Sequence, residues 1–307
     1  MRLVFAGTPE PAVEPLRQLV ASRHEVVAVL TRPDARKGRG RTLHPSPVKE
    51  VALEHGIEVL EPATLKDNEE IRARLRELAP DCIPVVAYGN LIPADMLGIP
   101  EHGWVNLHFS LLPQWRGAAP VQHAILYGDT DTAATVFRIN EGLDTGEVLN
   151  VLADEVRADD TADELLRRLS ARGAATLVET MDGLEDGTIT PYPQEGDASY
   201  ASKITVEDVR IDWRQPAEVV DRAIRAFTSA PGAWTTLSGE RVKVDPVRVS
   251  GEDTLEPGEV LPGKKEVRVG TGTQDVVLTR IQPPGKKMMN AADWARGLRA
   301  DERVVFE

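Results

Sequence analysis

Three polar side chains in two separate segments have the types and spacing that acyl transfer needs. Asn106 and His108 stand two residues apart on a predicted strand, so both side chains leave the same face of the sheet. A proline-terminated turn at 110–113 follows and places the pair at the carboxyl end of the strand, where open parallel sheets bind ligands. Asp144 lies in a second turn, 142–146, which follows another predicted strand. We therefore expect the three side chains to converge at one edge.

An amide and an imidazole side by side supply two donors for an oxyanion, and a nearby carboxylate orients the imidazole or accepts a proton. No serine or cysteine is obviously placed for activation by the histidine, so a covalent intermediate is not required. The trio suits transfer of an acyl group to an amine through a tetrahedral intermediate. Structural roles stay open at this point: Asn106 as a cap, His108 as a core histidine, and Asp144 as part of an Asx turn.

Other common site types do not match the sequence. The first predicted strand ends in Gly7-Thr8-Pro9-Glu10, which lacks the Gly-x-Gly-x-x-Gly turn of dinucleotide sites, and there is no Gly-Lys-Ser/Thr phosphate loop. The six histidines show no paired metal-ligand spacing, and Cys82 is the single cysteine. We expect no metal and no disulfide framework.

Apolar runs alternate with amphipathic stretches along the first part of the chain. This pattern predicts an α/β domain with a mainly parallel sheet, which would position the three side chains. Strands are predicted at 3–6, 26–31, 57–60, 83–87, 105–108 and 135–139, and helices at 12–22, 48–55, 69–78 and 161–184. Polar and proline-rich residues at 190–207 predict a linker. After it, a helix at 217–226 and strands at 233–237, 241–249, 258–261, 266–271 and 276–282 predict a small β-barrel of the oligonucleotide-binding (OB) type. The predicted domains are thus 1–189 and 208–307.

Charge is unevenly distributed along the chain. The net charge of −13 falls entirely in residues 1–207, with 20 basic and 33 acidic residues, whereas 208–307 has 16 of each. Within the acidic part, Arg32 to Lys49 carries six basic residues against Asp34 alone. Such a run is typical of a solvated loop or of a nucleic-acid contact. No apolar stretch is long enough for a membrane span or a signal-peptide core, so we expect a cytoplasmic protein without a membrane partner.

The sequence resembles the folate-dependent formyltransferases. Their signature is matched by Asn106-x-His108-x-Ser110-Leu111-Leu112-Pro113-x-x-Arg116-Gly117, and their second motif by Leu143-Asp144-Thr145-Gly146. Further matches narrow the resemblance to members that act on methionyl-tRNA: residues 5–9, 32–34, 38–40, 45–49, 85–89, 115–120, 210–213 and 285–287. Phe109 departs from the motif, where the family usually has a small residue.

The resemblance implies a Rossmann-like catalytic domain and transfer of the formyl group of 10-formyltetrahydrofolate to the α-amino group of initiator methionyl-tRNA. It implies that Asn106 and His108 donate to the oxyanion, and that Asp144 positions His108 and helps to remove the amine proton. For the folate cosubstrate it points to a slot formed by Ser110, Leu111, Leu112, Pro113, Ala87, Tyr88 and Gly89. For tRNA it points to Arg36, Lys37, Arg39, Arg41, Lys286 and Lys287. We expect a monomer.

Two rival interpretations remain from the sequence. A folate-dependent formyltransferase acting on a glycinamide ribonucleotide or an amino sugar would share the trio, but would leave the basic segment and the barrel unexplained. A non-catalytic RNA-binding protein would explain the barrel and the basic segment, but would leave the trio without a function.

Overall fold

The computed structural model of the chain describes residues 1–37, 42–298 and 303–307. It divides into two compact units. Unit 1 comprises Met1–Gly117, Asp131–Glu155 and Leu166–Tyr200; unit 2 comprises Ala118–Thr130, Val156–Leu165 and Ala201–Glu307. Every helix in the described ranges is too short or too polar to cross a lipid bilayer. The boundaries predicted at 189 and 207 stay a prediction.

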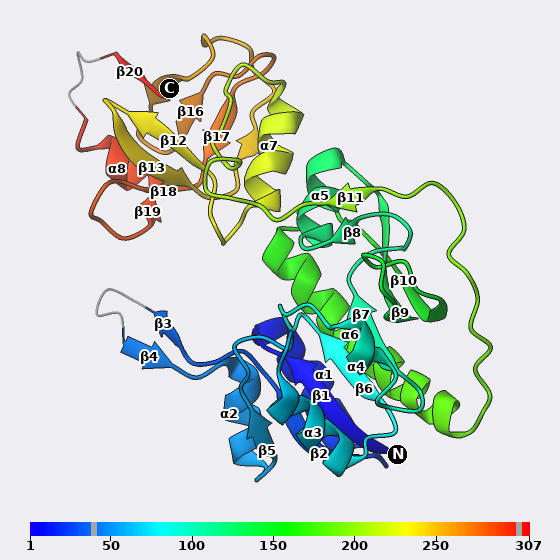
Figure 1. Cartoon of the computed structure of the whole chain (residues 1–307). Helices are drawn as coiled ribbons and strands as arrows, with labels where there is room; N and C mark the ends of the chain where they lie inside the picture. Colours follow the sequence, from blue (N-terminus) through cyan, green and yellow to red (C-terminus); the bar gives the residue numbers. More distant parts are fainter. Residues whose placement is uncertain (38–41, 299–302) are drawn as a thin grey trace. The chain divides into compact units, whose positions relative to one another are not determined.

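Unit 1 is built on one seven-stranded sheet. Its strands are β1 (Arg2–Gly7), β2 (Glu25–Leu30), β5 (Glu58–Leu60), β6 (Ile83–Val86), β7 (Trp104–His108), β9 (Asp131–Arg138) and β10 (Val148–Glu155). The order is β10-β9-β7-β6-β1-β2-β5 (Figure 1). The five strands from β5 to β7 are parallel, and β9 and β10 add an antiparallel edge. The mainly parallel sheet predicted from the sequence is confirmed.

The strand order places a topological switch beside β1. From β1 the chain runs outward through β2 to β5 and then returns to β6, on the other side of β1. The loops that follow β1 and β6 diverge at such a point. The carboxyl ends of these two strands frame the crevice in which open α/β sheets bind ligands. Thr8 follows β1 and Tyr88 follows β6; the Thr8 hydroxyl donates to the Tyr88 carbonyl at 2.9 Å. This bond fixes the spacing of the two loops.

Helices cover the sheet, and two of them begin at a capping side chain. The helices of unit 1 are the 3₁₀ turn η1 (Glu10–Ala12), α1 (Val13–Val20), α2 (Pro47–Glu54), α3 (Glu69–Leu78), α4 (Ala94–Leu97) and α6 (Ala162–Glu185), which begins in unit 2. The Ser46 hydroxyl caps α2 and the Asn68 side chain caps α3. Gly173 lets α6 approach closely, since a Cβ there would lie 3.1 Å from side-chain atoms of Leu107 and Ala134. The helix thus packs directly beneath β7.

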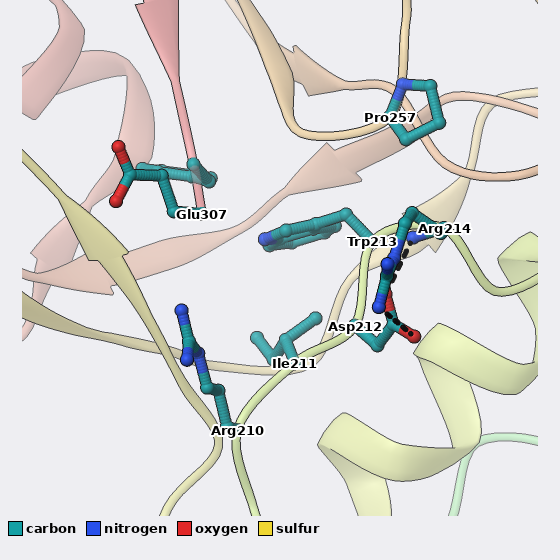
Figure 2. A pocket seen from close by; sticks show the side chains of 8 residues that line it. Arg210, Ile211, Asp212, Trp213, Arg214, Pro257 and Glu307 are labelled. Carbon is teal, nitrogen blue, oxygen red and sulfur yellow. Dashed lines mark hydrogen bonds and ion pairs between the residues drawn. The ribbon is translucent and has the colours of Figure 1, made fainter.

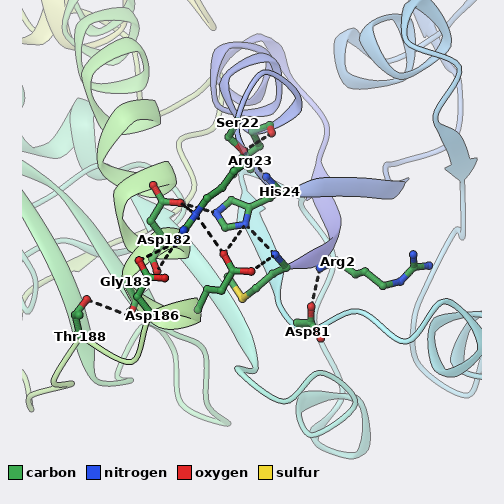
Figure 3. A network of polar contacts seen from close by, with 12 residues as sticks. Arg2, Ser22, Arg23, His24, Asp81, Asp182, Gly183, Asp186 and Thr188 are labelled. Atoms are coloured by element: carbon green, nitrogen blue, oxygen red, sulfur yellow. Dashed lines mark hydrogen bonds and ion pairs between the residues drawn. The ribbon is translucent and has the colours of Figure 1, made fainter.

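A polar network ties the end of α6 to the start of β2 (Figure 3). The His24 ring is fully buried, and its Nε2 lies 3.1 Å from Asp182 Oδ1. Burial lowers the pKa of His24 below its ordinary value. Ligand atoms of His24, Asp182 and Glu185 lie within 4.8 Å of one another, a spacing that a metal ion could use. Arg23 and the Met1 amine already pair with these carboxylates, so we interpret the cluster as an ion-pair network.

A short hairpin leaves unit 1 between β2 and α2. It consists of β3 (Ala35–Lys37) and β4 (Thr42–His44), which pair only with each other. Figure 1 shows the hairpin projecting from the body of the unit. The sequence predicts a basic segment here but no strands, because three-residue strands carry too little periodicity to detect.

Unit 2 contains two antiparallel sheets. One has the order β12-β13-β18-β19 and the other β14-β17-β16-β15-β20. Their strands are β12 (Trp234–Leu237), β13 (Glu240–Val244), β14 (Arg248–Val249), β15 (Glu259–Pro262), β16 (Val267–Val269), β17 (Val276–Leu278), β18 (Arg280–Gln282), β19 (Met289–Asn290) and β20 (Val304–Val305). The helices α5 (Pro120–Tyr127), α7 (Ala217–Ala226) and α8 (Ala291–Ala295) complete it. The predicted strand 241–249 is interrupted at Pro246, which has no amide to donate.

Candidate active site

Asn106 and His108 lie at the carboxyl end of β7, near the antiparallel edge. Asn106 is paired with Val85 of β6 and Phe137 of β9, and His108 with Thr135. The two side chains leave the same face of the sheet, as the sequence predicted. Asn106 is half-buried, and within the described residues its side chain makes no hydrogen bond. Its amide is therefore available to a ligand.

The two ring nitrogens of His108 have different partners. Nε2 donates to the Trp115 carbonyl at 2.9 Å, and because a carbonyl only accepts, this bond puts the proton of the neutral ring on Nε2. Nδ1 lies 3.8 Å from Asp144 Oδ2. The ring is 5% exposed, and burial lowers its pKa, while Asp144 and the Trp115 carbonyl raise it in part. The ring is therefore neutral near pH 7, with the Nδ1 lone pair facing the carboxylate.

The Asp144 carboxylate is held by the loop that contains Gly117. Its Oδ2 accepts from the Gly117 amide at 2.7 Å. The residue has a left-handed backbone (φ +51°), which aspartate tolerates better than most residues. Gly146 is required nearby, because a Cβ at that position would lie 1.6 Å from the Arg138 carbonyl oxygen. The structure thus brings His108 and Asp144 together from two separate segments.

The turn after β7 is fastened from beneath by Thr135. The Ser110 carbonyl accepts from the Thr135 hydroxyl at 2.6 Å, and the Leu112 amide donates to the same hydroxyl at 3.4 Å. Ser110 is fully buried, and its own hydroxyl donates to the Gln114 carbonyl at 2.6 Å. Of the four predicted folate residues in this turn, only Leu111 is exposed, at 38%. Thr135 was not among the predicted site residues, because its place opposite His108 on the adjacent strand is known only from the structure.

The second predicted folate segment follows β6 at the topological switch. Ala87 and Gly89 are exposed and have left-handed backbones (φ +47° and +81°), whereas the Tyr88 side chain is buried. Arg32 donates to the Gly89 carbonyl at 3.4 Å and also hydrogen-bonds the Asn90 side chain. The exposed backbone at 87 and 89 forms a polar edge beside the sheet. The contribution of Arg32 to this edge was not anticipated.

The predicted tRNA-binding residues fall in two places. Arg36 and Lys37 belong to β3, and Arg36 is exposed. Lys286 and Lys287 are exposed between β18 and β19. Within the described ranges Arg36, Lys286 and Lys287 form no ion pair, so their charges are available. Arg39 and Arg41 lie outside the described residues.

Unit 2 has a pocket of about 430 Å³ lined by residues 210–214. Trp213 stacks on Phe306 with 5.7 Å between ring centroids, and its indole donates to the Thr235 hydroxyl. Figure 2 shows Arg210 and Trp213 pointing toward the same open space, while Arg214 turns back to Asp212. Hydrogen bonds from Arg214 and Gln215 lower the pKa of Asp212 to about 2. Ile211 and Trp213 of the 210–213 motif therefore belong to the core of unit 2, whereas Arg210 is exposed.

Two family models match the chain. Residues 1–181 match the formyl transferase model, and residues 203–299 match the model of the formyl transferase C-terminal domain. The methionyl-tRNA formyltransferase of Corynebacterium glutamicum is 63% identical over 315 residues and is aligned over 100% of both chains. That of Streptomyces griseus is 58% identical over 303 residues, covering 97% of each chain.

Solved structures share the fold at lower identity. HypX from Aquifex aeolicus in complex with tetrahydrofolic acid has a TM-score of 0.69 at 20% identity, over 100% of this chain and 51% of that one. The methionyl-tRNA formyltransferase from Clostridium thermocellum has a TM-score of 0.59 at 18% identity, over 91% of this chain and 98% of that one. With the full-length relatives and both domain models, the assignment follows: the chain belongs to the methionyl-tRNA formyltransferase family.

Proposed function

We propose that the protein transfers the formyl group of 10-formyltetrahydrofolate to the α-amino group of initiator methionyl-tRNA, giving N-formylmethionyl-tRNA. The observation that carries the proposal is the approach of His108 and Asp144 to 3.8 Å at the carboxyl end of β7. The pair comes from the two motifs that carried the resemblance, in a chain that its named relatives match from end to end. Because the acceptor takes part in translation, the proposal places the enzyme in the cytoplasm.

The Asn106 amide and the His108 imidazole carry out the transfer in this proposal. The neutral amine attacks the formyl carbon, and negative charge develops on the formyl oxygen, which the Asn106 amide stabilises. As the new C–N bond forms, the attacking amine nitrogen becomes positively charged and acidic. Nδ1 of neutral His108 accepts its proton. The same proton then passes to the folate nitrogen as its bond to the formyl carbon breaks. The formyl carbon is then bonded to the amine nitrogen instead of the folate nitrogen, and the histidine returns to its neutral form.

Asp144 supports this cycle electrostatically. While His108 is protonated, the carboxylate at 3.8 Å from Nδ1 stabilises the imidazolium in a site where burial opposes it. The Trp115 carbonyl keeps the other nitrogen protonated throughout, so the ring exchanges its proton through Nδ1 alone. A carboxylate that orients and stabilises a histidine is a recurring catalytic arrangement.

The folate and the tRNA take different surfaces in this proposal. The exposed backbone at Ala87 and Gly89 and the exposed Leu111 side chain offer polar and apolar contacts to a flat pterin. Arg36 on the projecting hairpin and Lys286 and Lys287 in unit 2 offer phosphate contacts, together with Lys37, Arg39 and Arg41. The monomeric state stays a prediction.

An acceptor assay tests the proposal. The purified protein is mixed with 10-formyltetrahydrofolate that carries a labelled formyl group and with one of three acceptors: methionyl-tRNA, uncharged tRNA, or a small amine such as an amino sugar or a glycinamide. We expect label on methionyl-tRNA alone. Label on the small amine would favour the rival formyltransferase, and tRNA binding without label transfer would favour a non-catalytic RNA-binding protein.

A further inference from the structure

The segment between α6 and β11 (Tyr200–Ala201) runs over the surface of unit 1 but is fastened to it at defined points. Tyr192 exchanges two backbone hydrogen bonds with Val148, at 2.8 and 3.1 Å. The Ser199 hydroxyl accepts from the Trp115 amide at 2.9 Å. From 192 to 200 only Gln194 and Ser199 are half-buried, and the other residues are exposed. What the sequence predicts as a plain linker therefore has two inward-facing polar side chains.

Gln194 joins two loops through both ends of its amide. Nε2 donates to the Asp144 carbonyl at 2.8 Å and to the Gly146 carbonyl at 2.9 Å. Oε1 accepts from Arg116, at 3.1 Å from Nε and 2.7 Å from a terminal nitrogen. Because carbonyls only accept and a guanidinium only donates, only one orientation of the amide satisfies all four contacts. The side chain is thus a fixed bridge between residues 144–146 and Arg116.

This bridge lies beside the contact that holds the Asp144 carboxylate. Asp144 Oδ2 accepts from the Gly117 amide, and Gly117 is the next residue after Arg116. The Asp144 loop has little apolar packing to hold it, since residues 141–143 and 145 are exposed and the Leu143 side chain is 59% exposed. Its backbone at Asp144 is also in the left-handed region. Polar contacts must therefore fix the loop.

We propose that Gln194 is a positioning residue for Asp144: by bridging the Asp144 and Gly146 carbonyls to Arg116, it holds the carboxylate at its distance from His108. The inference rests on the proposed function, because it assumes that Asp144 supports transfer. Without the bridge, the loop keeps its covalent ends but loses the contacts on either side of Thr145. The carboxylate then samples positions farther from Nδ1, while the folate and tRNA surfaces stay as they are.

Three variants test the proposal in the full-length protein. Gln194→Ala removes the bridge. Gln194→Glu keeps the acceptor for Arg116 but turns a carboxylate toward two carbonyls, which it cannot bond when ionised. Glu195→Ala is the matched control, since Glu195 is an exposed neighbour with no hydrogen bond or ion pair within the described residues. We expect kcat to fall about 10- to 100-fold in the two Gln194 variants, the scale of a small misplacement of a reacting group. The Kd for folate and the KM for methionyl-tRNA should stay unchanged.

A spectroscopic readout separates positioning from general loosening. The pKa of His108 is followed by the NMR signal of its Cε1 proton, assigned by its loss in His108→Gln. In Gln194→Ala this pKa should fall, because the Asp144 carboxylate no longer stabilises the imidazolium at close range. In Glu195→Ala it should stay at the wild-type value. An unchanged His108 pKa together with a wild-type kcat in Gln194→Ala would overturn the inference.

A double-mutant cycle distinguishes failure of the inference from failure of the proposed function. Gln194→Ala is combined with Asp144→Asn, and single-turnover rates are compared. If Gln194 acts through Asp144, its removal costs nothing further in the Asp144→Asn background. Wild-type turnover by Asp144→Asn alone would refute the proposed function. Slow Asp144→Asn with a full additional loss in the double variant would refute only the positioning role.

Discussion

His108 owes its chemistry to an asymmetry between its ring nitrogens. One nitrogen donates to the Trp115 carbonyl at 2.9 Å, and the other faces a carboxylate at 3.8 Å. The sequence predicted that Asn106 and His108 share a face, because alternation along a strand requires it. The sequence could not predict the His108 tautomer. The tautomer depends on the position of the Trp115 carbonyl, which is set by the fold of the turn after β7. Which ring nitrogen faces the carboxylate is therefore visible only in the tertiary structure.

Removing either the Asn106 or the His108 side chain at the end of β7 should slow transfer without unfolding the protein. Asn106→Ala removes an oxyanion donor, and we expect kcat to fall about 10²- to 10³-fold. His108→Ala removes an acid–base group, and we expect a loss of about 10²- to 10⁴-fold. Single-turnover formyl transfer measures both, with circular dichroism to confirm folding. The exposed His55 provides a control, since His55→Ala should keep wild-type turnover. Near-normal turnover by His108→Ala would contradict the assignment.

The pH dependence of transfer should report the environment of His108. Burial lowers the pKa of His108 below its ordinary value of about 6.5, so the neutral base persists to lower pH than for a free histidine. We expect kcat to decline on the acid side with a midpoint below that value. In Asp144→Asn the imidazolium loses its stabilising carboxylate, so the midpoint should move further down. An upward shift in this variant would show that Asp144 does not stabilise the charged ring.

At the scale of elements, the long and strongly patterned segments were predictable. The helix expected at 161–184 is α6 (Ala162–Glu185), and the strand expected at 105–108 lies within β7. The strand β10 was not predicted, because only its first two residues are buried and the rest carry a weak apolar pattern. The residues around Gln194 were predicted as linker, because contacts made by one polar side chain leave no periodicity. At the candidate site, the contacts that hold the loops are therefore the main part that the sequence did not predict.

Gly146 gives a test of how strictly the Asp144 loop is built. In Gly146→Ala the new Cβ would lie 1.6 Å from the Arg138 carbonyl oxygen, so the backbone must move and carry Asp144 with it. We expect kcat to fall about 100-fold for a displacement near 1 Å. The free energy of unfolding, measured by thermal denaturation, should also fall by about 1–3 kcal/mol. Gly98→Ala is the control, since a Cβ there meets nothing within 4 Å. Wild-type kcat in Gly146→Ala would show that the loop tolerates displacement.

Across the whole molecule, charge sets a condition on where tRNA binds. Residues 1–207 carry all of the −13, and residues 208–307 are neutral. A polyanion is repelled by most of the acidic part, so basic residues must supply local attraction there. The segment from Arg32 to Lys49 has that charge, and the structure shows part of it as a hairpin that leaves the body of unit 1. Substitutions at the basic residues 36–41 should therefore affect the tRNA and spare the folate, whereas Arg32 contacts the predicted folate segment at Gly89.

Arg39→Ala tests this separation of substrates. A charge-assisted hydrogen bond contributes about 1.5–3 kcal/mol, so we expect the KM for methionyl-tRNA to rise roughly 10- to 100-fold. The slope of the logarithm of tRNA affinity against the logarithm of salt concentration should become shallower. Binding then releases about one counterion fewer, because one phosphate contact is lost. The Kd for folate should not change, since the 87–89 and 110–113 segments do not include the residue. Lys66→Ala removes one exposed positive charge from the same acidic part and should leave all three quantities unchanged. An equal loss of folate affinity in Arg39→Ala would show that the segment shapes the catalytic edge rather than the tRNA surface.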